Sequence, residues 1–244
     1  MAGADVSMGW RNLIIDKMHC GMQSYRCTDT REFNMNKAGK RPSGPVDRYH
    51  HGDLRAALIR AAEEVLAEEG LEGFSLRAAA RRAGVSIAAP AHHFGSAAGL
   101  LSEVAMLGFI ELAKRLDVGA VKATAAKRLR MQGEGYVRFA VAYPGRFHLM
   151  FRRDLLSDEH AGLREAGDKA LAQLETSVRA QLKLNADQPL DSAARAMLLA
   201  TWSVVHGFAH LLLDGKLAHM HADATSDDLL ESLLPEMLLS QWPD

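Results

Sequence analysis

The sequence contains almost no cysteine, which excludes several classes of protein. Two of the 244 residues are cysteines, Cys20 and Cys27, and both stand near the N-terminus. Their spacing matches no zinc-binding or redox motif, and two residues cannot form the disulfide framework of a secreted domain. We therefore expect a reducing setting and a cytoplasmic protein.

Net charge is also nearly absent. The formal net charge is −1, although 24% of the residues are charged. No overall positive field would draw this chain to nucleic acid, so any DNA binding must come from a local patch. One stretch upstream of the helical region carries such an excess of positive charge: Arg31, Lys37, Lys40, Arg41 and Arg48, against Glu32 and Asp47.

Signals for secretion or membrane insertion are missing or weak. The N-terminus lacks a charged start followed by a long apolar run, as a secretory signal has. One uncharged run, Ala196 to Leu213, reaches the lower length of a spanning helix, but it includes two histidines, a Ser, a Thr and a Gly. Because polar groups are costly in lipid, we predict a helix buried in a protein bundle and no membrane partner.

Apolar residues recur at helical spacing from Gly52 onward, and no strand pattern of useful length occurs, so the sequence predicts an all-α fold. The residues before about 47 lack periodicity, and 36–47 are rich in Gly, Pro and Lys, which predicts a mobile tail over 1–47. Met35 stands just before that stretch, and a start of translation there is a hypothesis. Helices are expected over 52–69, 75–83, 86–94, 96–116, 122–142, 145–152, 158–184, 191–214 and 226–240.

The tract from Phe74 to Phe94, FSLRAAARRAGVSIAAPAHHF, predicts two short helices on either side of Gly84. Ser75 is a good N-cap for the first helix, and Ser86 for the second. Gly84 can adopt the left-handed conformation that ends a helix. Two short helices joined by a tight turn are typical of a helix-turn-helix, whose second helix lies in the major groove of DNA.

Individual residues of this tract suit DNA contact. Ile87, Ala88 and Ala89 stand where the second helix would enter the groove and could touch thymine methyl groups, while His92 and His93 can donate to phosphates or simply cover a surface. Arg81 and Arg82 are expected on a solvated face. The basic tail is either an electrostatic arm or a solubilising segment, and His50 and His51 either approach phosphate or cap the first helix. The candidate DNA-binding residues are Arg48, His50, His51, Ser75, Arg77, Ser86, Ile87, Ala88, Ala89, Pro90, Ala91, His92 and His93.

These residues resemble the TetR family of bacterial transcriptional regulators. Tyr49–Gly70 (YHHGDLRAALIRAAEEVLAEEG) is similar to the family's first helix, the tract to Phe94 to its second and third, and Gly95–Leu101 to the start of its fourth. Farther on, Tyr136–Phe151 (YVRFAVAYPGRFHLMF) and Trp202–Gly207 (WSVVHG) are similar to the C-terminal domain of a subgroup marked by a Trp-His-Gly signature.

The resemblance implies a homodimer that binds a palindromic double-stranded DNA operator, usually represses, and is released by a small-molecule effector. It implies an N-terminal three-helix bundle with the helix-turn-helix, residues 48–97, and a C-terminal helical ligand-binding and dimerisation domain, residues 98–244. Ala91 and Ala97 depart from the family, which commonly has an aromatic residue and a Lys there to hold phosphate. Since phosphate contacts supply affinity, we expect weaker or more tail-dependent DNA binding.

The C-terminal half offers candidates for two further surfaces. A Met-rich and aromatic set that is otherwise plain core could bind an apolar or weakly polar effector: Met106, Phe109, Tyr136, Phe139, Met150, Phe151 and Trp202. In the family the last two long helices form the dimer interface, and the final helix here would be kinked at Pro235. The residues expected there are Trp202, His206, Gly207, His210, Leu230, Leu233, Leu234 and Met237.

Two other classes of function compete with this interpretation. His206 and His210, with His219 and His221 nearby, could bind a metal or serve an enzyme. A metal site needs a third ligand and an orienting shell, however, and the sequence contains no HxxEH, HExxH, G-x-S-x-G or phosphate-binding glycine loop. We therefore expect no enzyme, no metal and no cofactor. The second alternative is a helical interaction module that no longer reads DNA, which Ala91 and Ala97 favour.

Overall fold

The computed structural model describes residues 51–119, 122–219 and 225–244, which fall in one compact unit, His50–Asp244. Throughout these ranges the regular structure is helical, without strands, which confirms the predicted all-α fold. The predicted tail, including Met35, the basic stretch and Arg48, lies outside the described residues, as does His50. His51 begins the first described helix, but its side chain is not among those described.

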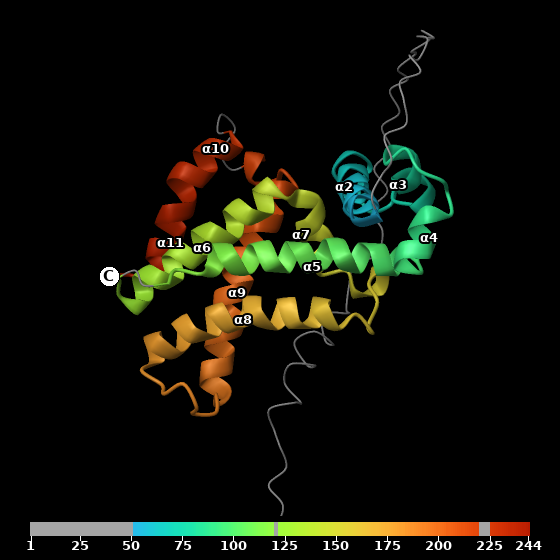
Figure 1. The fold of residues 1–244 in the computed structure, drawn as a ribbon. Coiled ribbons are helices and arrows are strands. Elements are labelled where there is room, and N and C mark those ends of the chain that lie inside the picture. The colour runs from blue at the N-terminus through green and yellow to red at the C-terminus, as the bar shows by residue number, and fades with distance from the viewer. Residues whose placement is uncertain (1–50, 120–121, 220–224) are drawn as a thin grey trace, which may run out of the picture. The chain divides into compact units, whose positions relative to one another are not determined.

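Three helices form the N-terminal part of this unit: α2 (His51–Glu69), α3 (Leu76–Arg82) and α4 (Ala89–Phe94) (Figure 1). The apolar stripe of α2, which includes Leu58, Ala62 and Val65, is buried. The stripe ends at Gly70, whose φ of 69° is in the left-handed region that favours glycine. The expected first helix and its stop are therefore confirmed.

The long helix α5 (Ala97–Leu116) contacts both parts of the unit. Ser96 caps it as predicted, since the Ser96 hydroxyl accepts a hydrogen bond of 3.1 Å from the Gly99 N–H. Its first turns contact α2 and α4, and its length packs against the helices of the C-terminal bundle (Figure 1). Leu100, Val104 and Ala105 on this helix are completely buried.

The C-terminal bundle follows the expected helices to within a few residues. It consists of α6 (Ala125–Ala142), α7 (Pro144–Met150), α8 (Ala161–Leu182), α9 (Ser192–Leu213), α10 (Ser226–Asp228) and α11 (Leu234–Gln241). A short 3-10 turn at Arg153–Leu155 lies between α7 and α8.

The predicted helix over 226–240 is not one continuous helix. A π-helical turn, Leu229–Leu233, stands between α10 and α11, and the Leu234 N–H donates to the carbonyl of Leu229, five residues earlier. Pro235 has no N–H with which to bond the carbonyl four residues before it, so the regular ladder cannot continue through this point. The kink predicted at Pro235 is thus a widened turn just before it.

Helix α9 is the one helix in the described ranges that is long and apolar enough to cross a membrane by length and composition. The core helix of a soluble protein has the same length and composition. Within this chain α9 packs against α6 and α8, and Leu198, Val205 and Phe208 are buried. This packing fits the predicted bundle helix.

Candidate nucleic-acid interface and ring cluster

The turn between α3 and α4 begins at Gly84, whose φ of 69° is left-handed, as predicted. This conformation lets the Gly84 N–H donate to the carbonyl of Arg81 (3.2 Å) and the Val85 N–H to that of Ala80 (3.0 Å). The Ser75 hydroxyl caps the start of α3 by accepting from the Ala78 N–H at 3.1 Å. Both ends of α3 are therefore fixed by the residues that the sequence indicated.

The predicted start of the second helix at Ser86 is wrong. Helix α4 begins at Ala89, its N-cap is Ala88, and no side chain caps it. Pro90 has no N–H with which to bond the Ser86 carbonyl in an α-helical turn, so the Ala89 N–H donates to that carbonyl instead, at 3.0 Å. Residues 86–88 therefore form a turn that presents its side chains before a six-residue helix.

This turn and the exposed face of α4 form the candidate DNA-reading surface. Ile87 is 59% exposed, a large aliphatic side chain in contact mainly with solvent. The residues Ser86, Ala88, Ala91 and His92 are exposed as well, while Ala89 and His93 are half-buried. Pro90 is buried, so the expectation that it contacts DNA is corrected.

The arginines of α3 differ in their partners. The Arg82 guanidinium donates to the Glu68 carboxylate at 2.7 Å, and this hydrogen bond lowers the pKa of Glu68. Arg77 and Arg81 are exposed, and neither forms an ion pair within the described part of the chain. Among the residues that the structure describes, these two cations of α3 have no acidic partner.

A second candidate site is a cluster of rings between α6, α7 and α9, which we call the ring cluster: Tyr136, Phe147, His148, Phe151, Trp202, His206 and His210. Neighbouring ring centroids lie 4.6 Å apart for His206 and His210 and 4.8 Å apart for Phe151 and His206. Phe109 of α5 extends the cluster, 5.9 Å from Phe151.

The centre of the ring cluster is hydrogen-bonded. The Trp202 Nε1–H donates to the Tyr136 hydroxyl at 3.1 Å, and that hydroxyl lies 2.7 Å from Nδ1 of His206. Since His206 Nδ1 is the acceptor within reach of the hydroxyl proton, we assign the His206 ring proton to Nε2. Burial, and then the nearby His210 and His148, lower the pKa of His206 to about 4. The imidazole is therefore neutral at pH 7.

Gln132 adds a polar group that the sequence did not single out. It is 2% exposed, and its Nε2 donates to the carbonyls of Leu116 (2.9 Å) and Gln173 (3.1 Å). Because both partners are carbonyls, the amide orientation is fixed, and the buried Oε1 has no hydrogen-bond partner among the described residues. Gln132 stands one helical turn before Tyr136 on α6, and this four-residue spacing is the signal that could have revealed it.

The predicted effector residues are only partly brought together. Phe109, Tyr136, Phe151 and Trp202 are in or beside the ring cluster, whereas Phe139 is fully buried with its ring against Tyr143. The two methionines lie against glycines, since an added Cβ would come within 2.5 Å of Met150 Sδ at Gly108 and within 2.9 Å of Met106 Sδ at Gly162. Phe147 and His148 were missed, although Phe147 stands four residues before Phe151.

Two of the predicted dimer residues need correction. Leu230 and Leu234 are 5% and 0% exposed inside the single chain, because the π-helical turn and α11 direct them into its own core. Leu233 and Met237 are half-buried, as are Trp202, His206, Gly207 and His210. The exposed large apolar residues near them are Leu199 and Leu211 of α9 and Leu239 of α11. Outside its own helix, no atom of the described residues lies within 4 Å of a Cβ placed on Gly207, so no other described helix covers it.

No group of three or more metal-ligating side chains gathers within the described residues. His206 and His210 instead take part in the ring cluster. His221 lies outside the described residues, and the side chain of His219 is not among those described.

Two parts of the chain match known families. Residues 58–104 match the bacterial regulatory proteins of the tetR family, and residues 129–237 match the tetracyclin repressor-like C-terminal domain. Together the two matches cover more than half of the chain, in the order that this family has them. The chain belongs to the TetR family. TetR-family regulators bind DNA operators and usually dimerise, they are transcriptional regulators rather than enzymes, and they are in general soluble and cytoplasmic.

Solved structures share the fold of this chain. A Rhodococcus sp. RHA1 protein of unknown function is 31% identical with a TM-score of 0.61, and the match covers 80% of this chain and 98% of that protein. A tetR-family regulatory protein from Rhodococcus RHA1 is similar in fold (18% identity, TM-score 0.57, 76% and 95% covered). So is the TetR-family regulator PfmR from Thermus thermophilus (21% identity, TM-score 0.52, 74% and 96% covered). No curated protein matches the chain.

Proposed function

We propose that this TetR-family protein is a sequence-specific, cytoplasmic transcriptional regulator, acting as a repressor that a small-molecule effector releases from its operator. The DNA-binding domain would comprise residues 48–97 and the effector-binding and dimerisation domain residues 98–244. The observation that carries the proposal is Ile87, 59% exposed in the turn before a short helix that already matches a DNA-binding family. Removing the Ile87 side chain from water would stabilise a complex with DNA, and a thymine methyl group offers an apolar surface for this contact.

The polar residues around this turn would contact the DNA backbone. Arg77 and His92 are exposed, and His93 is half-buried beside His92, with ring centroids 5.4 Å apart. These groups would hold phosphates, while Ile87 and Ala88 would meet base edges. Ala91 and Ala97 supply neither hydroxyl nor cation, so affinity would depend more on the three polar residues and on dimerisation.

Dimerisation is proposed through the exposed face of α9. Leu199 and Leu211 are 43% and 47% exposed and belong to the uncharged part of this helix, residues 196–213. Gly207 stands between them, and among the described residues outside its own helix no atom lies within 4 Å of a Cβ placed on it. An open glycine allows close approach of a second helix, and two exposed leucines supply apolar area. A second copy of the chain fits this face, with Leu239 of α11, 47% exposed, at its edge.

The ring cluster is the proposed effector site, together with Gln132. A buried Oε1 without a partner costs about 1–3 kcal/mol, which a ligand donor could offset. The hydrogen-bonded polar groups at the centre of the cluster are the Tyr136 phenol, the Trp202 indole N–H and the His206 imidazole, which is neutral at pH 7. They favour an uncharged, largely apolar effector that carries a hydroxyl or N–H donor.

A titration with the DNA upstream of the protein's own gene, at two salt concentrations, tests the proposal. A duplex of the same length and scrambled sequence is the matched control. We expect tighter binding to the native duplex and a loss of affinity as salt rises, because phosphate contacts release counterions. Equal binding to both duplexes, or none, would instead support the interaction module that Ala91 and Ala97 favour.

A further inference from the structure

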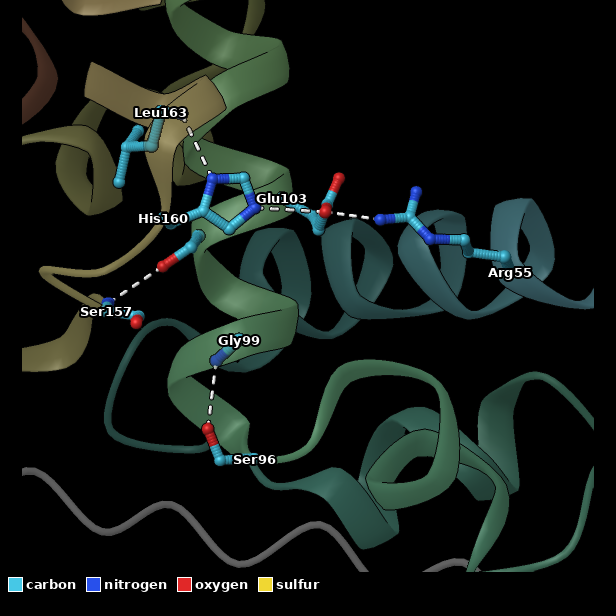
Figure 2. Close-up of polar contacts among 8 residues, drawn as sticks. Arg55, Ser96, Gly99, Glu103, Ser157, His160 and Leu163 are labelled. Carbon is cyan, nitrogen blue, oxygen red and sulfur yellow. Dashed lines mark hydrogen bonds and ion pairs between the residues drawn. The ribbon is translucent and has the colours of Figure 1, made fainter. Parts of the chain in front are cut away.

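Glu103, in the middle of α5, is a carboxylate that is 8% exposed. A charge in this position requires partners, because burying it unpaired is very costly. Figure 2 shows the two partners on either side of it. The guanidinium of Arg55 in α2 and Nε2 of His160 both contact Oε1 of Glu103, the latter at 3.0 Å. One carboxylate oxygen therefore joins the DNA-binding part of the unit to the start of α8.

His160 is held in place by its second nitrogen. It is the N-cap of α8, and its Nδ1 accepts a hydrogen bond of 3.1 Å from the Leu163 N–H. Because Nδ1 accepts, the ring proton is on Nε2 and is donated to Glu103. Three residues before His160, the Ser157 N–H donates a hydrogen bond of 2.8 Å to the hydroxyl of Ser102, which precedes Glu103 on α5. The segment that leads into α8 is thus fixed to α5 at two consecutive residues.

Arg55 continues the connection on the other side. Its guanidinium carbon lies 5.1 Å above the ring of Phe94, the last residue of α4. A planar guanidinium can stack on an aromatic ring and bind a carboxylate at once, which a Lys ammonium does less well. The contacts form one continuous series: the first turn of α8, His160, Glu103, Arg55, Phe94 and the end of α4.

We propose that Arg55, Glu103 and His160 are positioning residues that order α4 for DNA and make this order depend on the first turn of α8. The effect of this link on DNA binding rests on the proposed function, but its effect on the order of α4 does not. A coupling of this kind is reciprocal, so DNA bound at α4 stabilises the start of α8 by the same free energy.

The variant His160→Asn tests the link, because Asn is among the best N-caps and preserves the start of α8 while it is too short to reach Glu103. Arg164→Ala is the control: its guanidinium donates to the Asp158 carbonyl in the same segment and does not contact Glu103. The main measurement is hydrogen exchange of the α4 amides His92 and Gly95 in the free, full-length protein, which bond to the carbonyls of Ala88 and Ala91.

We expect His160→Asn to speed this exchange about threefold to tenfold and to weaken DNA binding by a similar factor. Arg164→Ala should change neither. In Glu103→Gln, which keeps an acceptor and loses the charge, the effect should be intermediate. In the wild type, bound DNA should slow exchange of the Leu163 amide, and in His160→Asn it should not.

The outcomes separate the two proposals. If the wild type binds no DNA but His160→Asn still loosens α4, the link is supported and the proposed function fails. If the wild type binds DNA and α4 exchanges equally in the wild type and His160→Asn, the link is overturned while the proposed function remains. A loss of global stability alone, with α4 no faster than the rest of the protein, would also overturn the link.

Discussion

Acid should destabilise this protein through His206. Its pKa is lowered from 6.5 to about 4 in the folded protein, first by burial and then by the neighbouring His210 and His148. Between these values the unfolded chain binds a proton that the folded protein does not, so stability present above pH 6.5 is lost as the pH falls toward 4. The full difference is reduced by solvent screening of a partly exposed ring, which leaves about 1–2 kcal/mol.

Urea unfolding at pH 7, 6 and 5 measures this loss. Carboxylates also contribute to it, so the informative quantity is the difference between the wild type and His206→Gln, whose amide can still accept from Tyr136 but does not titrate. We expect the wild type to lose about 1–2 kcal/mol more than the variant between pH 7 and 5. His148→Gln should remove a smaller part of the stability loss between pH 7 and 5, since burial also lowers the pKa of His148. Equal losses in the wild type and His206→Gln would refute the reasoning.

Three further predictions concern the Tyr136 hydroxyl, the backbone at Gly84 and the contacts to DNA phosphates. Tyr136→Phe leaves the Trp202 and His206 rings without their hydrogen-bond partner and should lower the free energy of unfolding, measured in urea, by about 1–3 kcal/mol. The control is Tyr143→Phe, which should cost less because the Tyr143 hydroxyl bonds no described residue. Gly84→Ala should lower the free energy of unfolding by about 1–2 kcal/mol, measured by thermal unfolding. The cost comes from the left-handed backbone alone, because no atom of the described residues outside its chain neighbours lies within 4 Å of the added Cβ, and an unchanged melting temperature would contradict this. Arg77→Ala combined with His93→Ala should weaken binding to all DNA sequences alike; a changed sequence preference at full affinity would show that these residues read bases.

Local features were predictable from the sequence because they depend on neighbouring residues. Ser75 and Ser96 cap their helices, and Gly84 ends α3, as their residue types indicate. Ser86 failed as a cap because Pro90, four residues on, cannot donate to its carbonyl. Both residues are visible in the sequence, but the position of the proline relative to the expected cap decides where the helix begins.

Tertiary neighbours were not predictable. Helical spacing placed Leu230 and Leu234 on an apolar face but could not say whether that face meets this chain or a second copy; the structure buries both within this chain. Glu103 resembles any charged residue of a helix surface, because its partners Arg55 and His160 stand 48 and 57 residues away. Only the folded arrangement shows that they share one carboxylate oxygen.

The most direct test of DNA reading by α4 and the preceding turn is selection of binding sites from a pool of random-sequence DNA duplexes by the full-length protein. DNA reading by this surface predicts enrichment of an inverted repeat, since a symmetric dimer presents two copies of α4 to the duplex. It also predicts a changed half-site when Ala88 is replaced by a larger residue. Recovery of unenriched DNA, or the same half-site in the Ala88 variant as in the wild type, would contradict it.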